Sequence, residues 1–169
     1  MESVPIYVNI FILVGERSRE VAEFLHKYEE LGCGHNSIVF ASSSNESPLR
    51  KIRTVNTGLA YADYFCSSGK SVLVVMDSIT RLAHSFRDVS ISRGELPVSR
   101  GFPPSVFSEL SKVVERCGNF YGRGSITAIF TILTEGDGSE DPVSDYMRGV
   151  LDAHFVLDRA KADKGLYPA

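Results

Sequence analysis

The sequence predicts an α/β fold, in which a mostly parallel β-sheet carries helices on both faces. Short, nearly continuous apolar runs rich in β-branched residues recur along the chain, a pattern typical of strands buried on both sides of a parallel sheet. Segments with helical spacing lie between these runs, and such alternation indicates parallel strands joined by helices. The apolar runs lie at Ile6–Val14, Ser37–Ala41, Ser71–Met76, Ser125–Leu133 and His154–Leu157.

The helices expected between these strands follow from apolar spacing and from residues that start or stop helices. The first spans Arg17–Leu31 and places four apolar side chains on one face, namely Val21, Phe24, Leu25 and Tyr28. Pro48 opens the second, which runs to about Cys66. A third begins after Asp77, and a fourth follows Pro103-Pro104 and stops at Gly118.

Composition excludes several classes of protein. The chain has 169 residues, a net charge of -3 and 43% hydrophobic residues, so it is neither disordered nor a nucleic-acid-binding protein with a clustered basic surface. Its longest apolar stretch, Val4–Val14, is interrupted and too short to cross a membrane. Three cysteines without a C-x-x-C pair suggest neither disulfides nor zinc, and we expect reduced thiols and a cytoplasmic location.

Charged and polar side chains follow the predicted strands. Ligands bind at the carboxyl ends of parallel strands, so these side chains, with Arg17 and Arg81, are expected to meet at one rim. Carboxylate oxygens there suit a magnesium ion, and guanidinium groups suit phosphate oxygens. The segments that follow the strands are Gly15-Glu16-Arg17, Ser42–Asn45, Asp77-Ser78 and Glu135-Gly136-Asp137.

Simpler interpretations exist for each of these residues. Asp77 at a strand end often only caps the next helix, and Glu16 is a favourable acid at a helix N-terminus. His154, within an apolar run, is expected to be a core side chain. Gly69-Lys70-Ser71 is not a phosphate-binding P-loop, because Tyr64 stands where the motif needs glycine and the segment precedes a strand instead of following one.

Five blocks, in order and spacing, resemble the catalytic domain of the rotary-type ATPases, which implies a RecA-like P-loop NTPase core. The stretch from Glu135 through Asp141-Pro142 to Arg148–His154 is most similar to the flagellar and type III secretion export ATPases within that superfamily. The five blocks are Val14–Glu20, Val75–Arg81, Gly101–Val106, Gly124–Thr127 and Gly165–Ala169.

The resemblance implies a role for each matched residue. Glu16 matches the catalytic glutamate that orients the water attacking the terminal phosphate, and Arg17 matches the neighbouring arginine that senses that phosphate. Asp77 matches the Walker B aspartate that holds magnesium through water, and Arg81 matches an arginine of the nucleotide-binding site on the following helix. The Asp77-Ser78 bond is a candidate for a non-proline cis peptide. ATP and Mg²⁺ are the implied cofactors.

The resemblance also implies partners. These are a homo-hexameric ring, a coiled-coil central stalk, peripheral stator proteins, and export substrates with their chaperones. Two loops, Ser90–Pro104 and Thr134–Pro142, are expected to face the ring's central pore. The implied location is cytoplasmic, with peripheral association at the export gate on the inner face of the cell membrane.

The motifs of the family are not all present. The P-loop lies upstream of the first strand in the family and the arginine finger lies downstream of the Tyr-Pro-Ala block, so residues 1–169 are expected to form a partial nucleotide-binding ATPase domain that hydrolyses no ATP alone. A catalytic beta-type subunit of a proton-translocating ATP synthase and a truncated, non-catalytic ring-docking module remain alternatives. A phospho-accepting receiver domain is disfavoured, because Gly15-Glu16-Arg17 lacks paired acids and Asp158-Arg159 lacks a lysine.

Overall fold

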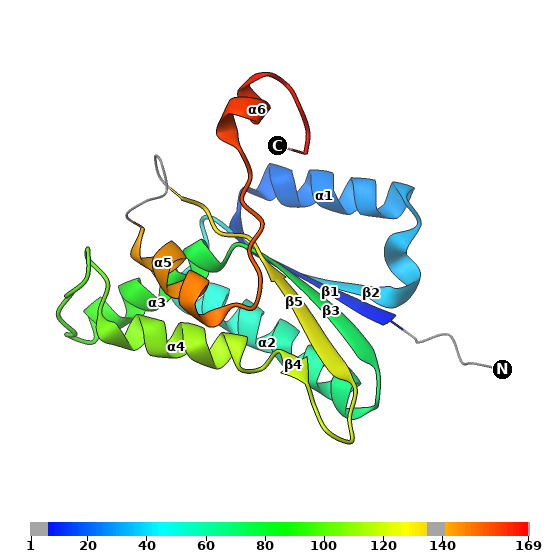
Figure 1. Ribbon diagram of the computed structural model, residues 1–169, viewed down its shortest axis with the longest axis horizontal. Helices are drawn as coiled ribbons and strands as arrows, with labels where there is room; N and C mark the ends of the chain where they lie inside the picture. Colours follow the sequence, from blue (N-terminus) through cyan, green and yellow to red (C-terminus); the bar gives the residue numbers. More distant parts are fainter. Residues whose placement is uncertain (1–6, 135–140, 169) are drawn as a thin grey trace.

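The computed structural model describes residues 7–134 and 141–168, shown in Figure 1. The strands are β1 (Tyr7–Glu16), β2 (Ser37–Ser43), β3 (Ser71–Asp77), β4 (Gly118–Asn119) and β5 (Ser125–Phe130). The helices are α1 (Ser18–Glu30), α2 (Pro48–Ser67), α3 (Ile79–Ser92), α4 (Pro104–Val114), α5 (Pro142–Val150) and α6 (Arg159–Asp163), with a short 3-10 helix at Cys33–Asn36.

The strands form one sheet in the order β2-β1-β3-β5-β4. The first four of these are parallel to their neighbours, and β4 pairs antiparallel with the start of β5. The register places Leu13 of β1 beside Asp77 of β3, and Met76 beside Phe130 of β5. The carboxyl ends of the three central strands therefore meet at one edge of the sheet.

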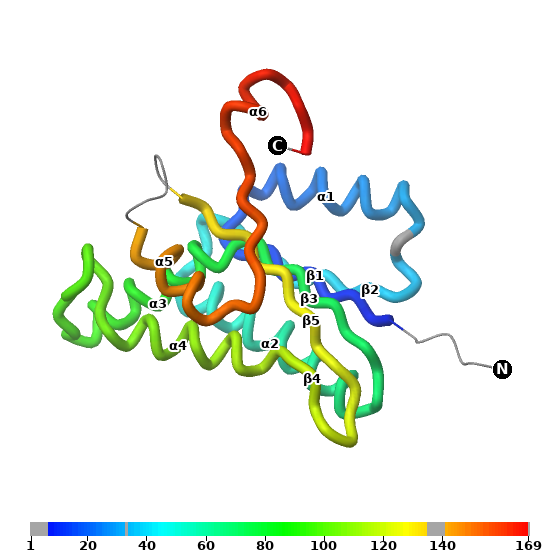
Figure 2. The backbone as a smooth tube through the Cα atoms, in the orientation of Figure 1, coloured from blue at the N-terminus to red at the C-terminus, as the bar shows by residue number. Residues whose placement is uncertain are grey.

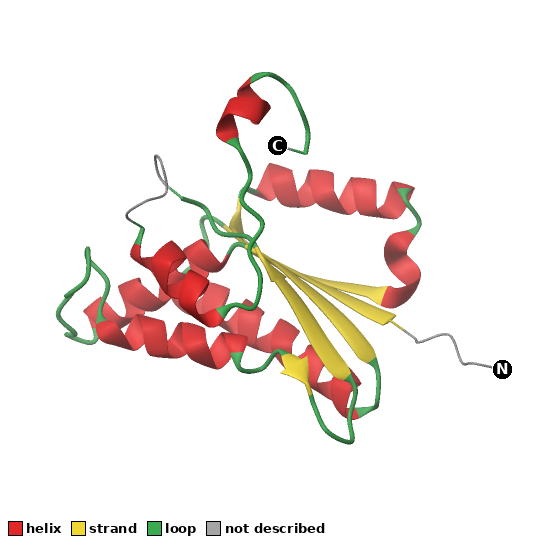
Figure 3. Cartoon of the chain, viewed as in Figure 1, coloured by secondary structure: helices red, strands yellow, loops and turns green. Residues whose placement is uncertain are grey.

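Helices cover both faces of the sheet, as the sequence predicts (Figure 3). On one face, α2 and α3 lie against the strands, with α4 and α5 packed outside them. This side holds the core, because alternate residues of β1 and β3 point into it and are fully or nearly fully buried. Its largest fully buried side chains include Ile10, Ile12, Leu59, Met76, Ile79, Leu82, Leu110 and Met147.

The opposite face is covered in part, by α1. The ring of Phe11 packs against Phe24 and Tyr28 of this helix, with centroids 5.4 and 5.8 Å away. Leu25, expected on the same apolar face, is instead exposed. Ile129 of β5 is also exposed, because α1 contacts β1 and β2 and leaves this end of the sheet open.

The structure corrects the prediction at His154–Leu157. This segment is an exposed coil between α5 and α6 instead of a strand, as the tube in Figure 2 shows, and His154 is exposed instead of buried in the core. Its apolar residues match a strand in composition, but no strand of the described residues pairs with it. Phe155 is 94% exposed as a result.

Two boundaries also differ from prediction. The last central strand ends at Phe130, and the carbonyl oxygen of the next residue, Thr131, accepts a hydrogen bond from the amide of Ile79 at the start of α3. Helix α4 ends at Val114, and Gly118 begins β4 instead of stopping the helix. The pairing of Gly118 with Ile126 of β5 is a tertiary contact that a local pattern does not reveal.

Among the described residues, no helix is both long and apolar enough to cross a lipid bilayer. Cys66 is buried and Cys117 half-buried, and both are free thiols. Burial raises the pKa of the Cys117 thiol to about 11, which makes it a poor nucleophile near neutral pH.

Candidate active site

A bulge at the end of β1 turns Glu16 toward the rim of the sheet. Val14 pairs with Ser42 and Glu16 with Ser43, so Gly15 is the extra residue between the two pairs. Its φ of 71° lies in the left-handed region that favours glycine. Bulges of this kind re-aim a side chain, and here the next side chain is a carboxylate.

Arg81 of α3 contacts both Gly15 and Glu16 at this bulge. Its Nη1 donates a hydrogen bond to the carbonyl oxygen of Gly15 at 2.6 Å, and its Nε lies 3.0 Å from Oε1 of Glu16. The packing is tight, since a Cβ added to Gly15 would lie 3.1 Å from Cδ of Arg81. A guanidinium group presents several donors in one plane, so a single side chain fixes both the backbone and the carboxylate.

Asp77 ends β3 beside Leu13, and the residue that follows β5 on its other side fixes its carboxylate. Thr131 donates a hydrogen bond from Oγ1 to Oδ1 of Asp77 at 2.6 Å. The Asp77-Ser78 peptide bond is cis, as predicted. Ser78 is then the N-cap of α3, and its hydroxyl oxygen accepts a hydrogen bond from the amide of Arg81 at 3.4 Å.

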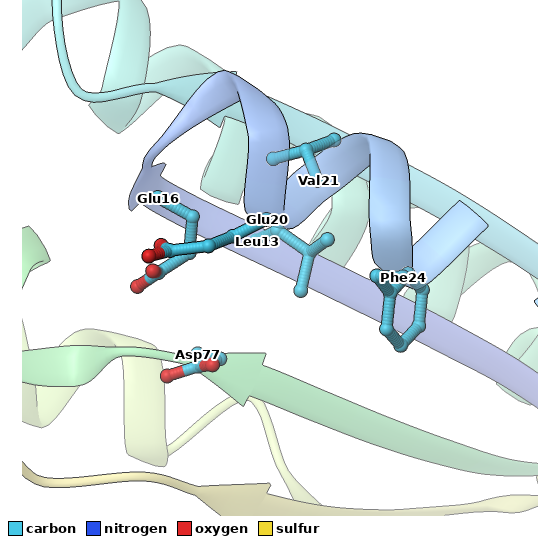
Figure 4. Close-up of a pocket in the computed structure, with 6 residues that line it drawn as sticks. All are labelled: Leu13, Glu16, Glu20, Val21, Phe24 and Asp77. Carbon is cyan, nitrogen blue, oxygen red and sulfur yellow. The ribbon is translucent and has the colours of Figure 1, made fainter. Parts of the chain in front are cut away.

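A pocket of about 320 Å³ opens between α1 and the ends of β1 and β3. Figure 4 shows the carboxyl groups of Glu16 and Glu20 side by side, with Asp77 across from them. The full lining is Leu13, Glu16, Glu20, Val21, Phe24 and Asp77. One end of the pocket is therefore acidic and the other apolar.

The pKa values of the two glutamates at the pocket are shifted in opposite directions. Burial raises the pKa of Glu16, and a hydrogen bond with Glu20 raises it further, while the charge of Arg81 opposes both effects. The backbone amide of Arg17 lowers the pKa of Glu20, with the hydrogen bond to Glu16 acting in the same direction. Glu16 therefore holds a proton more readily than its neighbour.

The predicted residues are only partly brought together. Glu16, Asp77 and Arg81 converge at the rim, whereas the largely exposed side chain of Arg17 turns to Glu20, 3.8 Å away. Glu135 and Asp137, also expected at the rim, lie outside the described residues. Two residues at the site, Glu20 and Thr131, were not predicted from the sequence. Glu20 stands three residues after the helix N-cap, which is the spacing of a capping box and a signal for its position.

Comparison with known proteins decides the family. The model of the ATP synthase alpha/beta family, nucleotide-binding domain, matches residues 2–169. The chain belongs to the ATP synthase alpha/beta family. Its α/β fold with a mostly parallel sheet matches solved ATPase structures.

Relatives of this alpha/beta family chain include export ATPases. The flagellum-specific ATP synthase of Pseudomonas aeruginosa is 48% identical over 93% of the chain, and the type 3 secretion system ATPase of Xanthomonas euvesicatoria is 43% identical over 96%. A solved prototypical ATPase from the type III secretion system of pathogenic bacteria matches with a TM-score of 0.88 and 42% identity, covering 96% of this chain and 46% of that one. The assembled ATPase EscN from the enteropathogenic E. coli type III secretion system gives the same TM-score. The chain spans about a third of the length of the curated relatives, 35% and 36% for the two named here.

The donor set of this family member fits a magnesium ion better than a softer metal. Asp77 contributes a carboxylate whose Oδ1 is anchored by Thr131. The described residues contain no group of three or more His, Cys, Asp or Glu side chains that would enclose a metal. Magnesium is commonly held by one or two carboxylates together with substrate phosphates and water, and the single carboxylate of Asp77 fits that pattern.

Proposed function

We propose that this chain is the central part of an ATPase that hydrolyses ATP to drive protein export by a flagellar or type III secretion system. The observation that carries the proposal is that Glu16 and Asp77 line one pocket at the carboxyl ends of parallel strands, with Arg81 ion-paired to Glu16. Relatives named for flagellar and type 3 secretion systems support the export role. A catalytic beta-type ATP synthase subunit, also an alpha/beta family member, remains the second candidate.

In the proposed reaction, a water oxygen attacks the terminal phosphorus of ATP and the bond to the ADP oxygen breaks. Glu16 accepts a hydrogen bond from that water and orients it, because its carboxylate is 14% exposed and held in place by Arg81. Bound magnesium would supply charge neutralisation at the phosphates, with Asp77 as its ligand through water. Positioning and electrostatics are the main requirements of phosphoryl transfer, so this small set of residues is adequate.

The two arginines have separate proposed roles. Arg17 contacts the terminal phosphate, since its side chain is largely exposed and its only described ion pair, with Glu20, is long at 3.8 Å. Arg81 belongs to the nucleotide-binding site and keeps Glu16 in place through its contacts with the Gly15 carbonyl oxygen and the Glu16 carboxylate. The phosphate-cradling loop and the arginine finger would come from other parts of the longer protein.

The proposed partners are based on the solved structures and on the family resemblance. Assembly into an oligomer is supported by the assembled state named for EscN, and the homo-hexameric ring is proposed on the family resemblance. A central coiled-coil stalk, stator proteins, export substrates and chaperones are proposed on the family resemblance. The proposed site of action is the cytoplasm, with peripheral association at the membrane.

The experiment that tests the function is the substitution Glu16→Gln in the full-length protein. Loss of the carboxylate removes the group that orients water, so turnover should fall by about a hundredfold or more. Nucleotide affinity should remain within about threefold of wild type, because Gln keeps the size and polarity of the side chain. ATPase assays and fluorescent-nucleotide titrations measure the two effects.

Glu23→Gln is the matched control, since Glu23 lies on α1 outside the pocket lining and forms an exposed ion pair with Lys27. Its turnover should equal that of wild type. Hydrolysis by Glu16→Gln at a near-wild-type rate would refute the role given to Glu16.

A further inference from the structure

The loop that follows β2 is tied to the backbone of Glu16. Ser43 is the last residue of β2 and the register partner of Glu16. The next residue, Ser44, donates a hydrogen bond from its amide to the carbonyl oxygen of Glu16 at 2.9 Å. This contact lies just after the bulge at Gly15, so through it the neighbouring segment of chain holds the main chain of the glutamate.

Lys51 of α2 contacts both this loop and the bulge. Its Nζ donates a hydrogen bond to the carbonyl oxygen of Ser44 at 3.0 Å. Its Cε lies 3.6 Å from the point that a Cβ on Gly15 would occupy, and Cδ of Arg81 lies 3.1 Å from the same point. The aliphatic stem of Lys51 therefore lies beside Gly15, while its ammonium group reaches Ser44.

Helix α2 is a rigid support for this contact. It packs against β1 and β2, and its residues Val55, Leu59 and Ala62 are at most 1% exposed. Lys51 lies one helical turn before Val55, so the packing of the helix fixes the backbone of Lys51 relative to the sheet. The hydrogen bond from Lys51 thus ties the loop at Ser44 to a well-packed helix.

The main chain at the bulge is consequently held at two consecutive carbonyl groups. Arg81 donates to the carbonyl oxygen of Gly15 at 2.6 Å, and Ser44 donates to that of Glu16. A shift of this backbone moves the Glu16 carboxylate with it. Displacements of about 1 Å at a reacting group can cost a large part of the rate, so the second contact matters as well as the first.

We propose that Lys51 is a positioning residue for Glu16: by holding the carbonyl oxygen of Ser44, it keeps the Ser44 amide on the Glu16 carbonyl oxygen and so fixes the backbone that carries the carboxylate. This inference rests on the proposed ATPase function. Because Lys51 acts through the main chain of Glu16, its loss lowers the rate of the chemical step more than the affinity for nucleotide.

Two substitutions separate the hydrogen bond from the packing of the stem. Methionine at position 51 keeps a long unbranched side chain beside Gly15 but has no donor, whereas arginine keeps a donor. In the full-length protein, Lys51→Met should lower kcat by about fivefold or more, with KM for ATP changed by less than about twofold. Lys51→Arg should keep kcat within about twofold of wild type, because its guanidinium group also donates to a carbonyl oxygen.

Arg53→Met is the matched control. Arg53 lies on the same helix, is exposed and carries the same charge, so this variant should have the kcat and KM of wild type. A wild-type kcat in Lys51→Met would overturn the proposal, and so would an equal loss in Arg53→Met, which would assign the effect to charge. Lys51→Arg as slow as Lys51→Met would show that the donor is not what matters. A rise in KM alone would mean that Lys51 contacts the nucleotide directly.

Amide hydrogen exchange measured by mass spectrometry tests the contact without reference to catalysis. In the nucleotide-free full-length protein, peptides that contain Ser44 should exchange about threefold faster or more in Lys51→Met and as in wild type in Lys51→Arg, because the Ser44 amide opens more often. Unchanged exchange in Lys51→Met would refute the role of Lys51. Wild-type protein without Glu16-dependent ATP hydrolysis would instead refute the proposed function, and the exchange result would still decide whether Lys51 holds Ser44.

Discussion

Gly15 determines how the chain turns into the site. Its backbone conformation and the nearby Arg81 side chain both disfavour a larger residue at this position. Its φ of 71° strains any side chain, and a Cβ would press on Arg81 at 3.1 Å. We predict that Gly15→Ala in the full-length protein lowers the free energy of unfolding by about 1–2 kcal/mol and also slows ATP turnover, since Arg81 must shift away from Glu16. Denaturant titration and steady-state ATPase assays measure the two effects.

Gly32→Ala is the control that separates the effect of backbone strain from the effect of displacing Arg81. Gly32 has nearly the same φ, 65°, but no neighbouring atom within 4 Å of an added Cβ. It should lose similar stability and keep full turnover. Equal turnover in the two variants would show that the contact between Gly15 and Arg81 has no part in catalysis.

The sequence predicted the residue types of the site better than their contacts. Glu16 and Asp77 follow predicted strands, so the parallel arrangement alone brings them to one edge. The direction of Arg17 toward Glu20 depends instead on side-chain rotamers at the first turn of α1. The Thr131 hydrogen bond to Asp77 depends on the path of the chain after β5, and no local pattern encodes that path.

At the scale of elements, α2 packs against the sheet through Gly58. A Cβ on this residue would lie 2.7 and 2.9 Å from side-chain carbons of Ile12, which is fully buried. We predict that Gly58→Ala costs about 1–3 kcal/mol of unfolding free energy through overpacking, although alanine is the better helix former. Urea unfolding followed by circular dichroism measures the change.

The control for this prediction is Gly149→Ala on α5, where an added Cβ meets nothing within 4 Å. That variant should gain about 0.5–1 kcal/mol from helix propensity alone. Stabilisation of both variants would show that Ile12 moves aside without cost and that the close approach of α2 is not required.

Local patterns predicted the elements well where the apolar runs are long enough to show a periodicity and are paired in the sheet. β1 and β3 lie in the middle of the sheet, and their continuous apolar runs marked them correctly. β4 has only two residues, Gly118 and Asn119, which is too short for any periodicity. The segment His154–Leu157 has the composition of a strand, but hydrogen bonding to a neighbour makes a strand, and composition does not supply the neighbour.

At the scale of the whole molecule, the two faces of the sheet differ in how completely they are covered. One face carries α2 and α3 with two more helices outside them, and it holds the buried core. On the other face α1 has no buried residue, and Ile129 of β5 is exposed. The pocket opens on this thinly covered face, between α1 and the strand ends, so the site is built on a rigid core but remains accessible.

The unpaired segment after α5 gives the last prediction. Phe155, Val156 and Leu157 are all largely exposed, so they contribute little to the folded state of residues 1–169 but offer apolar surface to other molecules. Replacing all three by serine should reduce the fluorescence of a bound hydrophobic dye. The melting temperature of the 169-residue chain should stay within about 2 °C of that of the unsubstituted chain, because few contacts are lost. By contrast, Leu82→Ala removes a fully buried side chain and should cost about 2–5 kcal/mol. A large fall in melting temperature for the triple variant would mean that the segment packs onto the domain in solution, in the manner that its strand-like sequence predicts.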